Sequence, residues 1–319
     1  MTTLSIVTPP VNIFALYCIM RKSTKQMSSY KWYLLAYQLT SSIFDFVFTV
    51  LILPVVFFPI PMGYADSMVA KWISLGSHIS LVLFILCVPF LTVMILSLFV
   101  YRCHLIIPQH NFLEINQRGQ AYISSVLLFI NCVPVAAGLV DISPDQSDAK
   151  QWALEEYSCA KSVIDVPRLH IYTPLSIRPL VITASAQGVF AAIVSIYTIW
   201  LSLQFLRKSD HMSQKTKNMQ KLVLIYLCVQ VSIPLFTLLV PVLALVYMLG
   251  ASSVLEQSAG NFALCCMGFH GFTANLSLIF CNDNYRSFIL MKIRGCARNV
   301  HKINASTSAE QWIVRSANQ

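Results

Sequence analysis

Seven long apolar stretches, separated by short polar segments, constrain what this chain can fold into. The stretches cover residues 4–20, 32–58, 72–100, 120–140, 179–206, 219–249 and 258–281. A helix needs about 20 predominantly apolar residues to cross the hydrocarbon core of a bilayer, and by that measure only the first stretch is marginal. The sequence therefore predicts an all-α membrane protein, a bundle of seven transmembrane helices.

The composition fits burial in lipid better than a water-soluble fold. Of the 319 residues, 56% are hydrophobic and 11% are charged, and the mean hydropathy is +0.66. Soluble domains carry about a quarter charged residues. The net charge of +9 could indicate nucleic-acid binding, but the basic residues form short runs beside the ends of the spans, without an RNA- or DNA-binding motif. We therefore expect anionic membrane lipid, and no nucleic acid, as their partner.

The distribution of Lys and Arg predicts the orientation of the bundle. All but five of the 22 basic residues lie in the gaps after the first, third and fifth stretches or in the C-terminal tail. Positive charge is retained on the cytoplasmic side during insertion. The N-terminus is therefore expected outside and the C-terminus inside. Because no basic region precedes the first stretch, we interpret it as an uncleaved span and not as a secretory signal.

The predicted organisation is one seven-transmembrane domain over residues 1–286 and a cytoplasmic tail over residues 287–319. Residues 287–296 mix apolar and basic side chains, which is typical of a short helix on the inner leaflet. In such a helix Cys296 would be a site for palmitoylation. A loose basic tail with an unmodified thiol is the alternative.

Asp45 is the one acidic residue well inside a predicted span. A carboxylate in the bilayer costs about 2.5–3.5 kcal/mol on insertion scales, so it should face the bundle interior and have a partner. We predict a structural and switching role for Asp45, with Asn275 of the seventh span as its partner. Pro234 interrupts the sixth span, where a missing backbone hydrogen bond bends the helix for either static packing or switching.

Four further polar side chains lie one to three turns deep in the third, fifth, sixth and seventh spans. They are candidates for fixing a small ligand in an apolar pocket: His78, Gln187, Gln230 and His270. The alternative for each is a hydrogen bond between helices.

The sequence predicts neither an enzyme nor a metal or cofactor site. Only His78 and His270 of the seven histidines lie within spans, whereas a zinc hydrolase needs three converging protein ligands. The chain carries no P-loop, no Gly-x-Ser-x-Gly motif and no dinucleotide fingerprint.

Several local motifs resemble the nematode serpentine chemoreceptors of class H, with class I as a close relative. They are found at residues 10–20, 25–35, 41–45, 215–221, 230–234, 269–271 and 285–288. The resemblance covers nearly the whole chain. It implies a G-protein-coupled receptor for an environmental small molecule, with a heterotrimeric G protein as partner, in the plasma membrane of sensory-neuron cilia.

The resemblance also suggests which residues face the G protein. Six residues near the expected inner ends of the spans are the candidates: Arg102, Lys215, Lys217, Lys221, Tyr285 and Arg286. The family often has Glu-Asn-Arg where this chain has Val100-Tyr101-Arg102, and a proline where it has Asn284. For Arg102 the alternative is a side chain that reaches lipid phosphates.

Two other classes of membrane protein share this number of spans. A ligand-gated channel of the insect odorant-receptor kind would place the N-terminus inside, against the distribution of basic residues. A transporter would show internal repeats, and the sequence has none that we detect.

Overall fold

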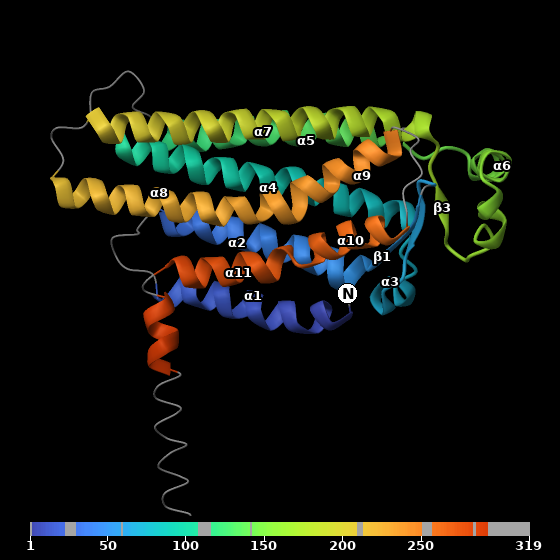
Figure 1. The fold of residues 1–319 in the computed structure, drawn as a ribbon, viewed down its shortest axis with the longest axis horizontal. Coiled ribbons are helices and arrows are strands. Elements are labelled where there is room, and N and C mark those ends of the chain that lie inside the picture. The colour runs from blue at the N-terminus through green and yellow to red at the C-terminus, as the bar shows by residue number, and fades with distance from the viewer. Residues whose placement is uncertain are drawn as a thin grey trace, which may run out of the picture.

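The computed structural model describes residues 2–22, 30–58, 60–107, 116–140, 142–208, 213–250, 257–282 and 285–292. Among them are seven helical segments that are long and apolar enough to cross a membrane, which confirms the predicted bundle (Figure 1). These segments are Thr3–Lys22, Tyr30–Ile52, Ser77–Ile106, Arg118–Leu139, Pro174–Lys208, Gln214–Leu245 and Gln257–Cys281.

The outer surface of the bundle supports a membrane environment. Many large apolar side chains point away from the core, among them Phe129, Ile196 and Phe236, each more than 60% exposed. Contiguous apolar surface of this kind would be a liability in water and is what a helix presents to lipid.

The spans are built from the following elements, several of them broken. They are α1 (Thr2–Lys22), α2 (Tyr30–Phe46) with the π-helix η2 (Val47–Ile52), α4 (Ser77–Ile106), α5 (Gln117–Val140), α7 (Pro174–Lys208), α8 (Gln214–Pro234) with the π-helix η4 (Leu235–Leu239) and α9 (Val240–Gly250), and α10 (Gln257–Gly268) with α11 (His270–Cys281). The long helix α4 packs most extensively, against α2, α5 and α7. It is therefore the centre of the bundle.

Two predicted spans run into other structural elements. The second span does not continue to residue 58, because the helix ends at Ile52 and Leu53 adopts the left-handed conformation with φ 47°. The residue before a proline avoids the helical region, and Pro54 then begins a strand. The third span does not begin at residue 72, because a separate helix, α3 (Met68–Trp72), precedes it and α4 starts only at Ser77.

A small antiparallel sheet, which the sequence did not predict, covers one end of the bundle. It consists of β1 (Pro54–Phe57), β2 (Met62–Ala65) and β3 (His170–Ile171), in that order. Next to it lie α6 (Gln146–Glu156) and the 3-10 helix η3 (Ser158–Ser162), whose apolar residues pack with those of the sheet. We call this end of the bundle the sheet end (Figure 1).

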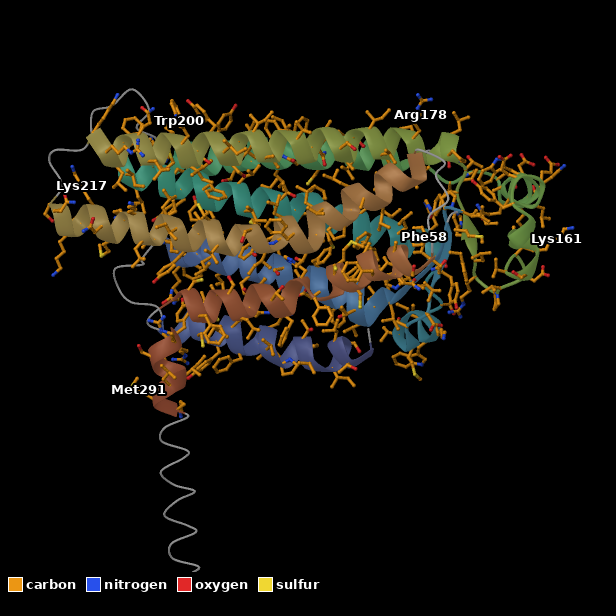
Figure 2. The ribbon with its side chains drawn as sticks, in the orientation of Figure 1. Phe58, Lys161, Arg178, Trp200, Lys217 and Met291 are labelled. Atoms are coloured by element: carbon orange, nitrogen blue, oxygen red, sulfur yellow. The ribbon has the colours of Figure 1, made fainter. Side chains whose placement is uncertain are left out.

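The opposite end carries most of the described basic residues, and we call it the basic end. Figure 2 shows Lys217 there, at the start of α8, whereas Lys161 lies at the sheet end. Residues 285–292 form a further helix that leaves the bundle at a steep angle (Figure 1). Phe288 of this helix contacts α1, with its ring 6.4 Å from that of Tyr17 and 4.3 Å from Lys22 Nζ. The predicted lipidation site, Cys296, lies outside the described residues.

Pro234 is where the sixth span changes from α-helix to π-helix. It ends α8, and the chain continues through η4 into α9, which turns toward α7 (Figure 1). Proline supplies no backbone N–H, and π-helical turns are frequent at functional sites.

Candidate functional site

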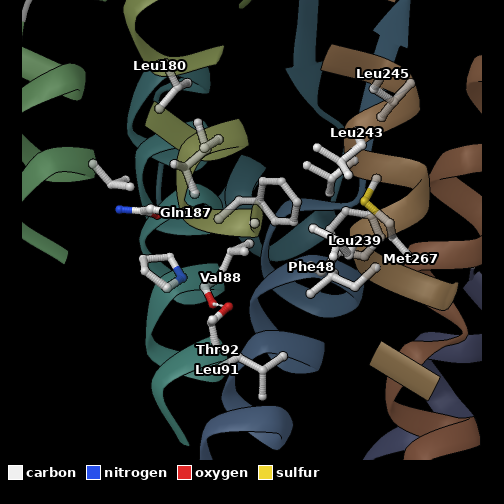
Figure 3. A pocket seen from close by; sticks show the side chains of 18 of the residues that line it. Phe48, Val88, Leu91, Thr92, Leu180, Gln187, Leu239, Leu243, Leu245 and Met267 are labelled. Atoms are coloured by element: carbon white, nitrogen blue, oxygen red, sulfur yellow. Dashed lines mark hydrogen bonds between the residues drawn. The ribbon is translucent and has the colours of Figure 1, made fainter. Parts of the chain in front are cut away.

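A cavity of about 560 Å³ lies inside the bundle, between α4, α7 and the α8–η4–α9 span. Figure 3 shows part of its lining, with Val88, Leu91 and Thr92 from α4, Leu180 and Gln187 from α7, and Leu239 and Leu243 from the sixth span. Its size falls within the roughly 300–1,000 Å³ of small-molecule sites.

The sheet closes one end of this cavity. Residues of both β1 and β2 line it, and so do His170 of β3 and Tyr172, which follows this strand. Two sets of hydrogen bonds hold the hairpin of β1 and β2 in place. Gln257 of α10 accepts from Phe58 N at 2.8 Å and donates to Val56 O at 2.7 Å, and Tyr172 N donates to Pro61 O at 2.9 Å. The strands therefore form a cap that is hydrogen-bonded to the bundle on two sides.

Of the three predicted ligand contacts whose side chains the structure describes, only Gln187 lines the cavity. Gln187 is in the lining, but its Nε2 donates a short hydrogen bond to the Asn131 carbonyl of α5. His270 is fully buried away from the lining, with Nε2 3.5 Å from Ser41 Oγ and Nδ1 3.2 Å from Thr237 Oγ1. The side chain of Gln230 lies outside the described part of the chain.

His78, the fourth candidate, belongs to a polar cluster at the cap. Its Nδ1 is 3.2 Å from Tyr172 Oη, and its ring centroid is 5.3 Å from that of His170. His170 Nε2 is in turn 3.1 Å from Ser143 Oγ and 3.2 Å from Gln146 Nε2. Sequence reasoning missed His170 and Tyr172. Their spacing of two, which places side chains on one face of a strand, is the signal that could have found them.

Asp45 is held by a buried polar cluster that joins three helices. Asn12 Nδ2 of α1 donates to Asp45 Oδ2 at 3.2 Å, and Asn275 Nδ2 of α11 donates to Asn12 Oδ1 through a short hydrogen bond. Gln38 Nε2 of α2 donates to Asn275 Oδ1 at 2.7 Å. The predicted pair of Asp45 and Asn275 therefore meets through Asn12, which sequence reasoning missed along with Gln38. We call these four residues the Asp45 cluster.

Gly271 lets α11 approach the Asp45 cluster closely. A Cβ atom at this position would overlap the Asp45 carboxyl group, and the Gly271 backbone hydrogen-bonds that group instead. Asn275 Nδ2 also donates to Gly271 O at 2.7 Å. A residue without a side chain is needed here because backbone and carboxylate are in direct contact.

Arg102 is engaged inside the basic end by aromatic rings. Its guanidinium carbon lies 3.5 Å from the ring centroid of Tyr30, and Tyr30 stacks on Tyr101 at 5.9 Å. Arg102 Nε is buried without a hydrogen-bond partner among the described residues. A cation over an aromatic face is stabilised by the ring quadrupole. The Tyr30 ring is therefore the partner of the Arg102 guanidinium in this structure.

The other candidates at the basic end are unevenly exposed. Lys215, Lys221 and Arg286 are exposed, and Lys217 is partly exposed at the start of α8 (Figure 2). Tyr285, which was expected to face a partner, is fully buried in the apolar core instead. Tyr285 is the first residue of the tail helix, and its expected exposure came from the family resemblance alone.

The close contact at Gly271 predicts a large effect of one methyl group. Gly271→Ala should lower the free energy of unfolding by at least about 2 kcal/mol, because overpacking a core costs about 1–3 kcal/mol and here displaces a hydrogen-bonded carboxylate. Thermal or chemical unfolding of the purified protein measures this. Gly138→Ala is the matched control, since a Cβ there meets its nearest atom, Thr183 Oγ1, at an ordinary 3.7 Å. Equal effects of both substitutions would contradict this account.

The lowered pKa of His170 predicts that the stability of the protein depends on pH. Burial, and secondly the neighbouring His78, lower the pKa of His170 to about 4, whereas in the unfolded chain it is about 6.5. Between these values protons bind the unfolded chain preferentially, so stability should fall as the pH falls from 6.5 to 4. His170→Asn should flatten this part of the curve of melting temperature against pH. Parallel curves for the two proteins would refute the assignment.

The comparisons with known proteins give this arrangement its context. The chain matches the family profile described as "Serpentine type 7TM GPCR chemoreceptor Srh" over residues 1–295. A search of curated proteins returned no match. The profile describes receptors and not enzymes, and its seven transmembrane helices agree with the seven spans of the structure. The chain therefore belongs to the Srh family of serpentine seven-transmembrane chemoreceptors, which are G-protein-coupled receptors.

Proposed function

We propose that this protein detects a small environmental molecule in the cavity between α4, α7 and the sixth span, and that it activates a heterotrimeric G protein at the basic end. The cavity is the observation that carries this proposal, because it is of ligand size and lies inside the bundle of a chemoreceptor-family protein. The plasma membrane of sensory-neuron cilia is the proposed location, on the earlier resemblance.

The proposal requires the sheet end outside and the basic end inside the cell. The positive-inside rule supports this orientation, since the exposed lysines of α8 and the basic tail helix lie at one end. An epitope tag at the N-terminus should therefore stain on unpermeabilised cells, and a C-terminal tag only after permeabilisation. The reverse result for the N-terminal tag would favour the channel alternative, whose N-terminus is inside.

The sixth span connects the two ends. Pro234, Leu235 and Leu238 line the cavity, and α8 continues from them to the lysines of the basic end. A ligand that contacts η4 differently in two arrangements of this span would shift the population between them. The π-helical turn and the missing hydrogen bond at Pro234 make this the point where the span bends most easily.

In this account the Tyr30–Arg102 stack holds the resting state, because a guanidinium packed on Tyr30 is withheld from a partner. Tyr30→Leu removes the ring, and a cation–π contact of about 0.5–2 kcal/mol corresponds to a shift of about 2- to 30-fold toward the active state. Tyr30→Phe keeps the ring and is the control. Ligand-independent second-messenger production, normalised to surface expression, should rise for Tyr30→Leu only. Unchanged or lower basal signalling of Tyr30→Leu would refute the resting-state role.

The function itself is tested by a calcium or cyclic-nucleotide readout in cells that express the receptor and a promiscuous G protein, against a panel of odorants. We expect a response to at least one compound, and its loss in Arg102→Ala at equal surface expression. Silence toward the whole panel with intact surface expression would count against the proposal.

A further inference from the structure

The chemistry of the cavity wall defines the class of ligand, and this inference rests on the proposed function of the cavity. No Asp, Glu, Lys or Arg side chain is found among the described residues that line it, and burial lowers the pKa of the lining His170 to about 4, so that this side chain is neutral at pH 7. A carboxylate or an ammonium group would enter without a counter-charge and would lose its hydration, which is strongly unfavourable in an apolar site. The wall therefore selects against ions.

Most polar side chains of the wall are already engaged within the protein, and among the described lining hydroxyls those of Tyr64 and Ser195 make no hydrogen bond. Four lining hydroxyls donate to backbone carbonyls: Ser77 to Arg168 O, Ser80 to Gly76 O, Thr92 to Val88 O and Ser232 to Val229 O. Gln187 Nε2 donates to the Asn131 carbonyl. A ligand that needs several hydrogen-bond donors would have to break these bonds, because a donor can rarely serve two strong acceptors.

The polar cluster at the cap is engaged in the same way. The Tyr172 hydroxyl pairs with His78, and His170 Nε2 pairs with Ser143 and Gln146. What remains toward the cavity is mostly hydrocarbon, and Figure 3 shows the side chains of Leu91, Leu180 and Leu239 in this part of the lining. Affinity in such a site comes from apolar area and shape.

We infer that the ligand of this cavity is an uncharged, largely hydrocarbon molecule with few hydrogen-bonding groups, recognised by its shape. Carboxylates, amines and sugars are excluded as ligands of this site.

The reactivity of a native cysteine shows which reagents enter the cavity, so no cysteine has to be introduced. Cys228 of α8 lines the cavity, whereas Cys132 of α5 is similarly part-buried but does not line it. Methanethiosulfonates modify a thiol when its thiolate attacks the reagent, forming a mixed disulfide and releasing methanesulfinate. Reagents with a neutral methyl, a cationic trimethylammonium-ethyl or an anionic sulfonatoethyl group share this chemistry and differ in charge.

The first measurement is the rate of modification of Cys228 in the full-length protein in lipid nanodiscs, by peptide mass spectrometry. After division by each reagent's rate with free cysteine, the neutral reagent should react at least about ten times faster than either ion. Equal corrected rates for all three reagents would overturn the inference.

The second measurement is protection by probe molecules of equal chain length and different charge. At equal free concentration, 1-octanol should slow neutral modification of Cys228 and leave Cys132 unchanged, whereas octanoate and octylammonium should leave both unchanged. Protection by either ion as strong as that by 1-octanol, or none by 1-octanol, would overturn the inference.

Two tryptophan substitutions test whether 1-octanol protects Cys228 by binding in the cavity. Ala184→Trp fills the lining and should abolish protection by 1-octanol, whereas Ile193→Trp, on the same helix but 60% exposed and outside the lining, should keep it. Slow modification of the buried Cys18 and Cys103 shows that each variant is folded. Equal protection in both variants would place 1-octanol elsewhere and overturn the inference.

These measurements need no G protein, so their failure is distinct from failure of the proposed function. A receptor that signalled in response to a carboxylate or an amine would keep the proposed function and overturn the ligand class.

Discussion

The hydrogen bonds of the Asp45 cluster are the interaction on which the rest of the bundle depends. Within the hydrocarbon layer no water satisfies a polar side chain, so each must find a partner inside the protein. Asn12, Gln38, Asp45 and Asn275 do this together, and in doing so they fix α1, α2 and α11 relative to one another. Gly271 completes the cluster by letting the backbone of α11 touch the carboxyl group.

The other half of the bundle is held together by apolar packing instead of buried hydrogen bonds. Between α4, α7 and the sixth span the packing is apolar and leaves a cavity, and the sixth span is broken by a π-helical segment. Apolar contacts are non-directional, so this half can rearrange and leave few polar groups unsatisfied, the contact of Thr237 with His270 being a polar link of the sixth span to α11. A directional polar half and an apolar half with a cavity together suit a receptor in which ligand binding displaces one span against a fixed frame.

The sequence was a good guide to the bundle and a poor guide to its interior. Span number followed from the lengths of the apolar stretches, because lipid imposes a minimum length on each helix. The sheet could not be predicted in this way, since Pro54–Phe57 is an apolar run that continues the second span without a polar break. Short apolar runs do not distinguish strand from helix, and the third strand, His170–Ile171, is far away in the sequence from β2, with which it pairs.

A second reason explains why only some of the predicted site residues line the cavity. Depth along a span can be counted from the sequence, but the rotation of a helix about its axis depends on its neighbours. His270 and Gln187 both lie within spans, yet only Gln187 lines the cavity. Asp45 was more predictable, because a buried carboxylate requires a partner wherever the helix points. That its direct side-chain partner is Asn12 follows from how closely α1 packs on α2 and α11.

The most direct test of this account is the interaction energy between Asn12 and Asn275, from the unfolding free energies of Asn12→Ala, Asn275→Ala and the double variant. Hydrogen bonds between membrane helices contribute on average about 0.6 and at most about 1.7 kcal/mol, and we expect a coupling in this range. If the two single effects add to within about 0.3 kcal/mol, the residues are energetically independent and the Asp45 cluster does not hold the three helices together.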